Sequence, residues 1–140
     1  MFPDYGPEVE RIGDWIAAGA NLAPGRTLLL EPELPEAPDV VAACFEAGGQ
    51  WDRDRGIQDW GVLLVARAPT LAQSRALARE CIVAALQGFA TANEEQRGLI
   101  QMLDLASLPI HRGRDERGRV ILEATLRMRI FARDETGVAL

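Results

Sequence analysis

The chain has 140 residues, and 48% of them are apolar, which is enough for one hydrophobic core and too many for a disordered chain. Acidic residues outnumber basic ones by 21 to 15, so the formal net charge is −6, whereas a general nucleic-acid binder needs a basic surface. All 15 basic residues are arginines, which excludes Schiff-base and P-loop lysine chemistry. We therefore expect a single domain over residues 1–140.

The cysteines and the apolar runs bear on the compartment of the protein. Cys44 and Cys81 lie among apolar neighbours, so we expect two buried, reduced thiols without metal-binding spacing. The segment from Met1 to Tyr5 lacks the pattern of a signal peptide. No apolar run approaches the roughly 20 residues that span a bilayer. The sequence thus predicts a protein of the cytosol, or of a particle assembled there, with no membrane partner.

The first predicted element is a short amphipathic helix. Gly6-Pro7 suits its first turn, and Gly19 and Asn21 are its stop signals. Its apolar residues recur at spacings of three and four, as expected for one buried face: Val9, Ile12, Trp15 and Ile16.

Three strands are predicted after this helix. Residues 27–30 and 40–46 read as short strands, and the three prolines between them predict an extended connection. Gly48-Gly49 is expected to end the second strand. A polar loop is predicted at 50–59, before a nearly continuous apolar strand at 60–66.

A long helix and two strands are predicted in the second half. Thr70 suits the N-cap of a helix over residues 71–89, whose apolar residues form one stripe. A strand at 99–106 is followed by a charged loop at 109–119 that begins with a proline. The strand at 120–133 alternates between apolar and polar residues, which indicates one buried and one polar face.

This element order predicts the fold class. We expect an α+β fold with a mainly antiparallel sheet of about four to five strands. One long helix packs on the sheet, and a short helix stands at the N-terminus.

Residues that could support catalysis are few. His111 is the only histidine, and no nucleophile elbow accompanies it. Adjacent acids occur in pairs that are typical of solvated loops: Glu94-Glu95, Asp115-Glu116 and Asp134-Glu135. We therefore expect no catalytic, cofactor or metal site. A small α+β enzyme or ligand-binding module built on His111, Asp115 and Glu116 remains the alternative from a different class.

The most charged segment runs from Gly113 to Arg119. It contains Arg114, Asp115, Glu116, Arg117 and Arg119 in a span that also suits a tight turn. Three arginines and two acids could instead form ion pairs between neighbouring subunits, which set register and partner choice.

Arginines on the last predicted strand extend this basic character. Arg127 and Arg129 lie on its polar face, which faces either solvent or another subunit. Trp51, Arg53 and Arg55 form a second interface candidate, because Trp and Arg are enriched at interface anchors.

Several fragments occur in a characteristic order along the chain: Leu34-Pro35 and Pro38-Asp39 before a strand, Gly48-Gly49 after it, Val65-Ala66-Arg67-Ala68, the helix from Ala76 to Leu86, and the segment from Gly113 to Arg119. Taken together, they resemble the tail-terminator (minor capsid, tail-completion) proteins of long-tailed bacteriophages. Ala47 departs from the pattern, since the family often has Thr before the paired glycines.

The resemblance implies a structural virion protein, assembled in the bacterial cytoplasm, and not an enzyme. Such proteins form a homo-hexameric ring on the last ring of the tail tube, stop its polymerisation and meet the head–tail connector. Double-stranded DNA passes through the lumen, and an acidic wall would let it slide without specific binding. A head-closure or connector ring of the neck is the alternative within the same class.

Overall fold

The computed structural model describes residues 6–20, 22, 26–29, 40–52 and 56–131. The helices are α1 (Gly6–Gly19), α2 (Leu71–Thr91) and α3 (Glu94–Arg97). The strands are β1 (Arg26–Leu29), β2 (Val40–Asp52), β3 (Ile57–Ala68), β4 (Ile100–Arg114) and β5 (Val120–Phe131).

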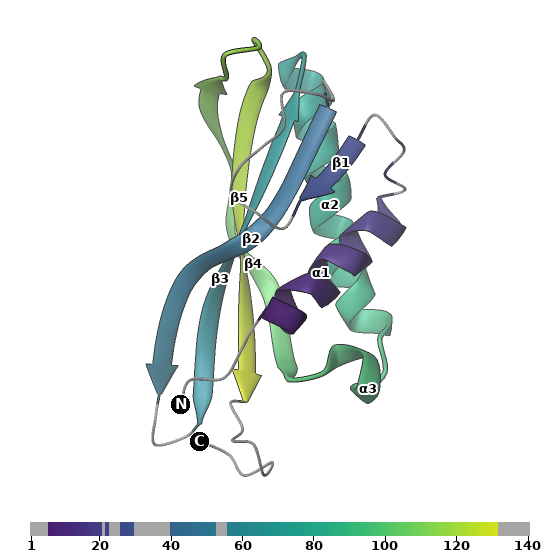
Figure 1. Ribbon diagram of the computed structural model, residues 1–140, viewed down its shortest axis with the longest axis vertical. Coiled ribbons are helices and arrows are strands. Elements are labelled where there is room, and N and C mark those ends of the chain that lie inside the picture. Colours follow the sequence, from purple (N-terminus) through teal and green to yellow (C-terminus); the bar gives the residue numbers. More distant parts are fainter. Residues whose placement is uncertain (1–5, 21, 23–25, 30–39, 53–55, 132–140) are drawn as a thin grey trace.

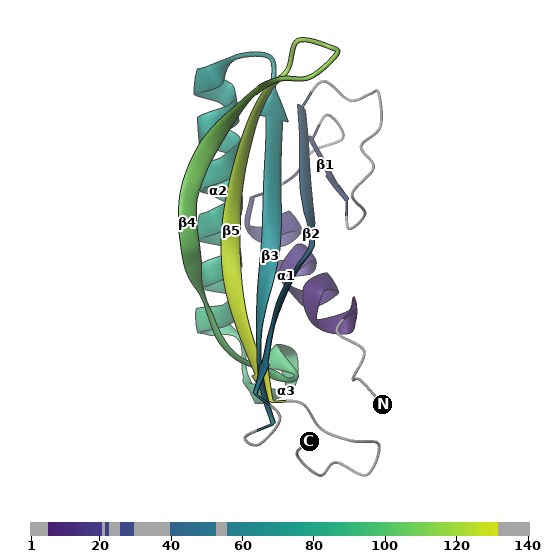
Figure 2. The same cartoon turned by 90° about the vertical axis from the view of Figure 1, so that its left-hand side faces the viewer.

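The five strands form one sheet in the order β1-β2-β3-β5-β4. β1 pairs with β2 in parallel, and all other pairs are antiparallel. The helices α1 and α2 lie on the same face of the sheet, α1 toward β1 and β2 and α2 across β3, β5 and β4 (Figures 1 and 2). This arrangement confirms the predicted α+β class, and it leaves β1 and β4 at opposite edges.

The core lies between the helices and the sheet, as the sequence patterns predict. Thr70 caps α2 by accepting a hydrogen bond from the Gln73 amide at 3.2 Å. Buried Ser74 donates to the Val120 carbonyl oxygen at 2.7 Å and so ties α2 to β5. On β5, alternate side chains face the helices and are buried: Val120, Leu122, Ala124, Leu126, Met128 and Ile130.

Both cysteines are buried thiols, as predicted. Cys44 lies on β2 and Cys81 on α2, within the same hydrophobic core. Burial raises the pKa of the Cys44 thiol to about 12, and the nearby Cys81 contributes to the shift. Both side chains therefore act as small apolar residues.

The predicted polar loop at 50–59 is wrong, because its described parts continue the strands. β2 runs on to Asp52, and β3 already begins at Ile57, so the two form a long antiparallel pair. The register shifts between Glu46 and Gly49. A Cβ at Gly49 would collide with the backbone carbonyl of Asp59, so the paired glycines make a β-bulge and do not end the strand.

The predicted break at Pro109 is also wrong. β4 continues through this proline as far as Arg114, which reduces the predicted loop to a short turn. Proline is tolerated here because β4 is an edge strand, and the pairing with β5 is irregular between Ser107 and Ile110.

The helices α1 and α2 approach each other closely at two glycines. A Cβ on Gly19 would lie 2.6 Å from the Ala84 Cβ, and one on Gly88 would collide with Cβ and Cγ of Trp15. The Trp15 and Phe89 rings pack beside this contact with their centroids 6.2 Å apart. The absence of a side chain at these glycines thus fixes the distance between α1 and α2.

We expect Gly88→Val to lower the free energy of unfolding by about 1–3 kcal/mol, because the new side chain overlaps Trp15. Urea denaturation measures the change. Gln87→Val, at the adjacent exposed position, is the matched control and should change stability by less than about 0.5 kcal/mol. Equal losses in both variants would contradict the close approach.

Candidate interaction surfaces

The turn between β4 and β5 is built around the carboxylate of Asp115. Its Oδ1 accepts hydrogen bonds from the amides of Arg117 and Arg119, both at 2.9 Å. Its Oδ2 accepts one from the Arg119 Nε at 2.7 Å. Gly118 takes a φ of +76°, and its amide donates to the Asp115 carbonyl oxygen at 2.9 Å. One side chain therefore organises the most charged segment of the sequence.

A second arginine, from β3, reaches the same carboxylate. The Arg67 guanidinium donates to Asp115 Oδ2 at 3.1 Å, and only 6% of the Arg119 side chain is exposed. Burial alone would raise the pKa of Asp115, but hydrogen bonds from Arg119, Arg67 and Arg117 lower it to about 2. The charged network thus fastens the turn to the end of β3.

The other candidates in this segment lie on the surface. Arg114 is exposed and donates to the Gly118 carbonyl oxygen at 2.7 Å and to that of Pro69 at 3.5 Å. Glu116 and Arg117 are exposed as well. Asp115 and Arg119 therefore have a role within the chain, while an interface role for the segment stays a prediction.

The face of the sheet opposite the helices carries a row of ion pairs. Asp59 and Arg129 are cross-strand partners joined by two hydrogen bonds, of 2.7 and 3.1 Å. Arg127 likewise pairs with its cross-strand partner Asp104 at 3.0 Å. The hydrogen bond from Arg129 also lowers the pKa of Asp59.

These pairs are partly exposed, so each contributes little stability and mainly favours one strand register. The sequence predicted Arg127 and Arg129 on a polar face, and their positions agree. Their acidic partners come from β3 and β4 and were missed, because no local pattern links such distant residues.

The third group of candidates is only partly described. Trp51 lies on β2 opposite Gln58. Arg53 and Arg55 lie outside the described residues.

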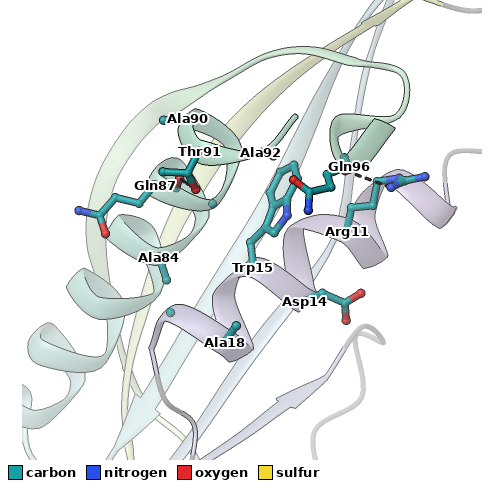
Figure 3. Close-up of a pocket in the computed structure, with 12 residues that line it drawn as sticks. Arg11, Asp14, Trp15, Ala18, Ala84, Gln87, Ala90, Thr91, Ala92 and Gln96 are labelled. Carbon is teal, nitrogen blue, oxygen red and sulfur yellow. Dashed lines mark hydrogen bonds between the residues drawn. The ribbon is translucent and has the colours of Figure 1, made fainter. Parts of the chain in front are cut away.

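A cleft of about 820 Å³ lies between α1, the C-terminal end of α2 and the segment that contains Gln96 (Figure 3). Arg11 donates from there to the Gln96 carbonyl oxygen at 3.0 Å, and the Gln96 side chain accepts from the Asn93 amide. In Figure 3, the Asp14 and Gln87 side chains point away from Trp15. The polar groups of this cleft therefore serve local structure and do not converge on a shared point.

A second groove of about 820 Å³ runs between α2 and the edge strand β4. Leu108 and Val83 are 75% and 43% exposed along it. Arg75, Arg79 and His111 are its only ionisable lining residues in the described part of the chain, so no acid lines it there. The sequence does not predict this groove, because a break is predicted at Pro109 where β4 in fact continues.

The described residues contain no group of three or more His, Cys, Asp or Glu side chains that could hold a metal ion. Among the helices that the structure describes, none is long and apolar enough to cross a membrane. A scan against protein-family models found no match, and a search of curated proteins found none either.

We expect Asp115→Asn to lower the free energy of unfolding by about 1–3 kcal/mol, because two guanidinium groups lose their charged partner. The pH dependence identifies the cause. Because the folded-state pKa of Asp115 lies below the unfolded value of about 3.9, its contribution is complete above that pH and is lost as the pH falls toward about 2.

Chemical denaturation between pH 7 and pH 2 should therefore show less acid sensitivity in Asp115→Asn than in the wild type. Glu116→Gln removes an exposed acid from the same turn and serves as the control, with stability unchanged within about 0.5 kcal/mol. An unchanged stability of Asp115→Asn at pH 7 would refute the role of this carboxylate.

Proposed function

We propose that the protein is a structural virion component that resembles a tail terminator and assembles into a closed ring. The ring caps the tail tube, stops its polymerisation and joins it to the head-side connector. The ordered sequence fragments that resemble tail terminators support this proposal. The five-stranded sheet with its long helix is the sheet-and-helix unit that the resemblance implies.

The observation that carries the proposal is the exposed apolar edge of the sheet. β4 is 15 residues long and lies at the edge, where Leu108 is 75% and Ile110 46% exposed. A long edge strand with protruding apolar side chains is a site at which another chain associates. Association by surface contact is therefore the activity that this molecule supports best.

The position of the edges favours a ring over an isolated dimer. β1 and β4 lie at opposite ends of the strand order, so the two lateral surfaces of a subunit differ. A contact between two different surfaces is head-to-tail, and repetition of such a contact closes a ring when the rotation allows it. The proposed partners are thus further copies of the chain, the major tail-tube protein and the connector.

The net charge fits the passage of DNA through such a ring. With a formal charge of −6, the subunit repels the duplex, which would then slide through the lumen. We propose no enzymatic step, cofactor or membrane partner.

Native mass spectrometry and negative-stain imaging test the proposal, on the protein alone and with the major tail-tube protein. We expect closed rings, free or at the ends of tubes of fixed length. Rings that bind the connector but never tubes would favour the alternative of a head-closure ring. A strict monomer under both conditions would overturn the assembly function.

We also expect Arg114→Glu to block ring formation and leave the monomer folded, because Arg114 is exposed on the charged turn. Circular dichroism reports the fold, and native mass reports the ring. Gln87→Glu introduces an acid at an exposed site on α2 and should still form rings. Normal rings from Arg114→Glu would exclude this turn from the interface.

A further inference from the structure

Two pairs of like charges stand out on the helices. Arg75 and Arg79 are exposed on α2, and Glu10 and Asp14 are exposed on α1. Each pair is spaced by four residues, so its side chains are neighbours on one helix face, with Cβ atoms about 5–6 Å apart. Such a like-charged pair is mildly unfavourable on an isolated helix.

Among the described residues, no partner relieves either repulsion. In the part of the chain that the structure describes, Glu10, Asp14, Arg75 and Arg79 form no ion pair. Other exposed charges behave differently, since Arg112 pairs with Glu123 at 3.0 Å. Both helix pairs are therefore available to an external group of opposite charge.

The arginine pair lies in a groove on the surface of the molecule. Arg75 and Arg79 line the groove between α2 and β4, whose exposed large apolar residues are Val83 and Leu108. Because acids are absent from the described lining, the groove attracts a negatively charged and partly apolar surface.

The acidic pair lies toward the opposite lateral side of the molecule. α1 contacts β1 and β2, whereas the groove is formed at β4, the other edge of the sheet. Figure 3 shows the Asp14 side chain pointing away from α2. Ala18, one turn further along α1, is also exposed and small, so it adds apolar surface without obstructing a close contact.

We propose that the groove between α2 and β4 receives α1 of a second copy of this chain. Arg75 and Arg79 of one subunit face Glu10 and Asp14 of the next, while Leu108 and Val83 pack beside Ala18. The inference rests on the proposed ring and names its subunit contact. Because the two surfaces lie toward opposite edges of one subunit, each copy gives one contact and receives another, as a ring requires.

The charges and the apolar residues have separate tasks in this contact. Two matched pairs of exposed charges select the partner and its register, and they add little affinity by themselves. The covered apolar surface supplies most of the attraction. The assembly should therefore weaken as salt rises but persist at moderate ionic strength.

Charge reversal provides a test with an internal rescue. One variant carries Arg75→Glu with Arg79→Glu, and the other carries Glu10→Arg with Asp14→Arg. Each variant alone places like charges across every contact, so we expect native mass spectrometry to find monomers. An equimolar mixture restores opposite charges at both kinds of contact, so it should form rings in which the two variants alternate.

The combined fourfold variant should likewise form rings, because its contacts are again complementary. Glu94→Arg with Glu95→Arg reverses an acidic pair on α3 and serves as the matched control, which should assemble like the wild type. Circular dichroism checks the fold of each variant. If a reversal variant does not fold, the corresponding Gln pair replaces it and should raise the concentration for half-assembly about fivefold.

The outcomes separate this contact from the wider function. Wild-type rings together with normal rings from both reversal variants would overturn the contact and leave the proposed function intact. Monomeric reversal variants whose mixture stays monomeric would also overturn it. A wild-type protein that remains monomeric with and without tail-tube protein would overturn the proposed function and, with it, this inference.

Discussion

The close approach of α1 to α2 is the constraint on which the rest of the structure depends. Where Gly19 and Gly88 meet Ala84 and Trp15, the two helices come near enough to share one face of the sheet. The hydrophobic core is then complete on that face, as the burial of alternate residues on β5 indicates. The opposite face carries the ion pairs between strands, and β4 forms one edge of the sheet.

The remaining surfaces differ in whether their charged side chains form ion pairs within the chain. On the face of the sheet opposite the helices, acids and arginines from neighbouring strands neutralise one another, as in the pair of Asp59 with Arg129. On the helices, the exposed pairs of opposite sign form no ion pair within the described part of the chain. A molecule with this asymmetry can contact copies of itself in one orientation, which is the property that separates a closed assembly from a random aggregate.

Local signals in the sequence, such as a cap residue or a regular spacing of apolar residues, predicted the elements that carry those signals. Thr70 and the apolar stripe after it located α2, and alternation located the described part of β5. The failures lie where distant residues decide the outcome. Gly48-Gly49 reads as a strand end, yet pairing with β3 carries the chain through it, and pairing with β5 does the same at Pro109. The candidate site was predicted in the same uneven way. The sequence indicates Asp115 as a candidate. Its partner Arg67 lies 48 residues away, and no sequence pattern indicates that the two residues pair.

Pro109 has one more consequence. A bare strand edge invites endless stacking of identical chains, because its amides and carbonyls offer a template for fibre growth. The proline removes an amide from the exposed part of β4, and the register of the strand is irregular on both sides of it. Another chain can therefore contact the side chains of β4 but cannot extend a continuous ladder of backbone hydrogen bonds along it. We therefore expect this edge to resist the growth of fibrils.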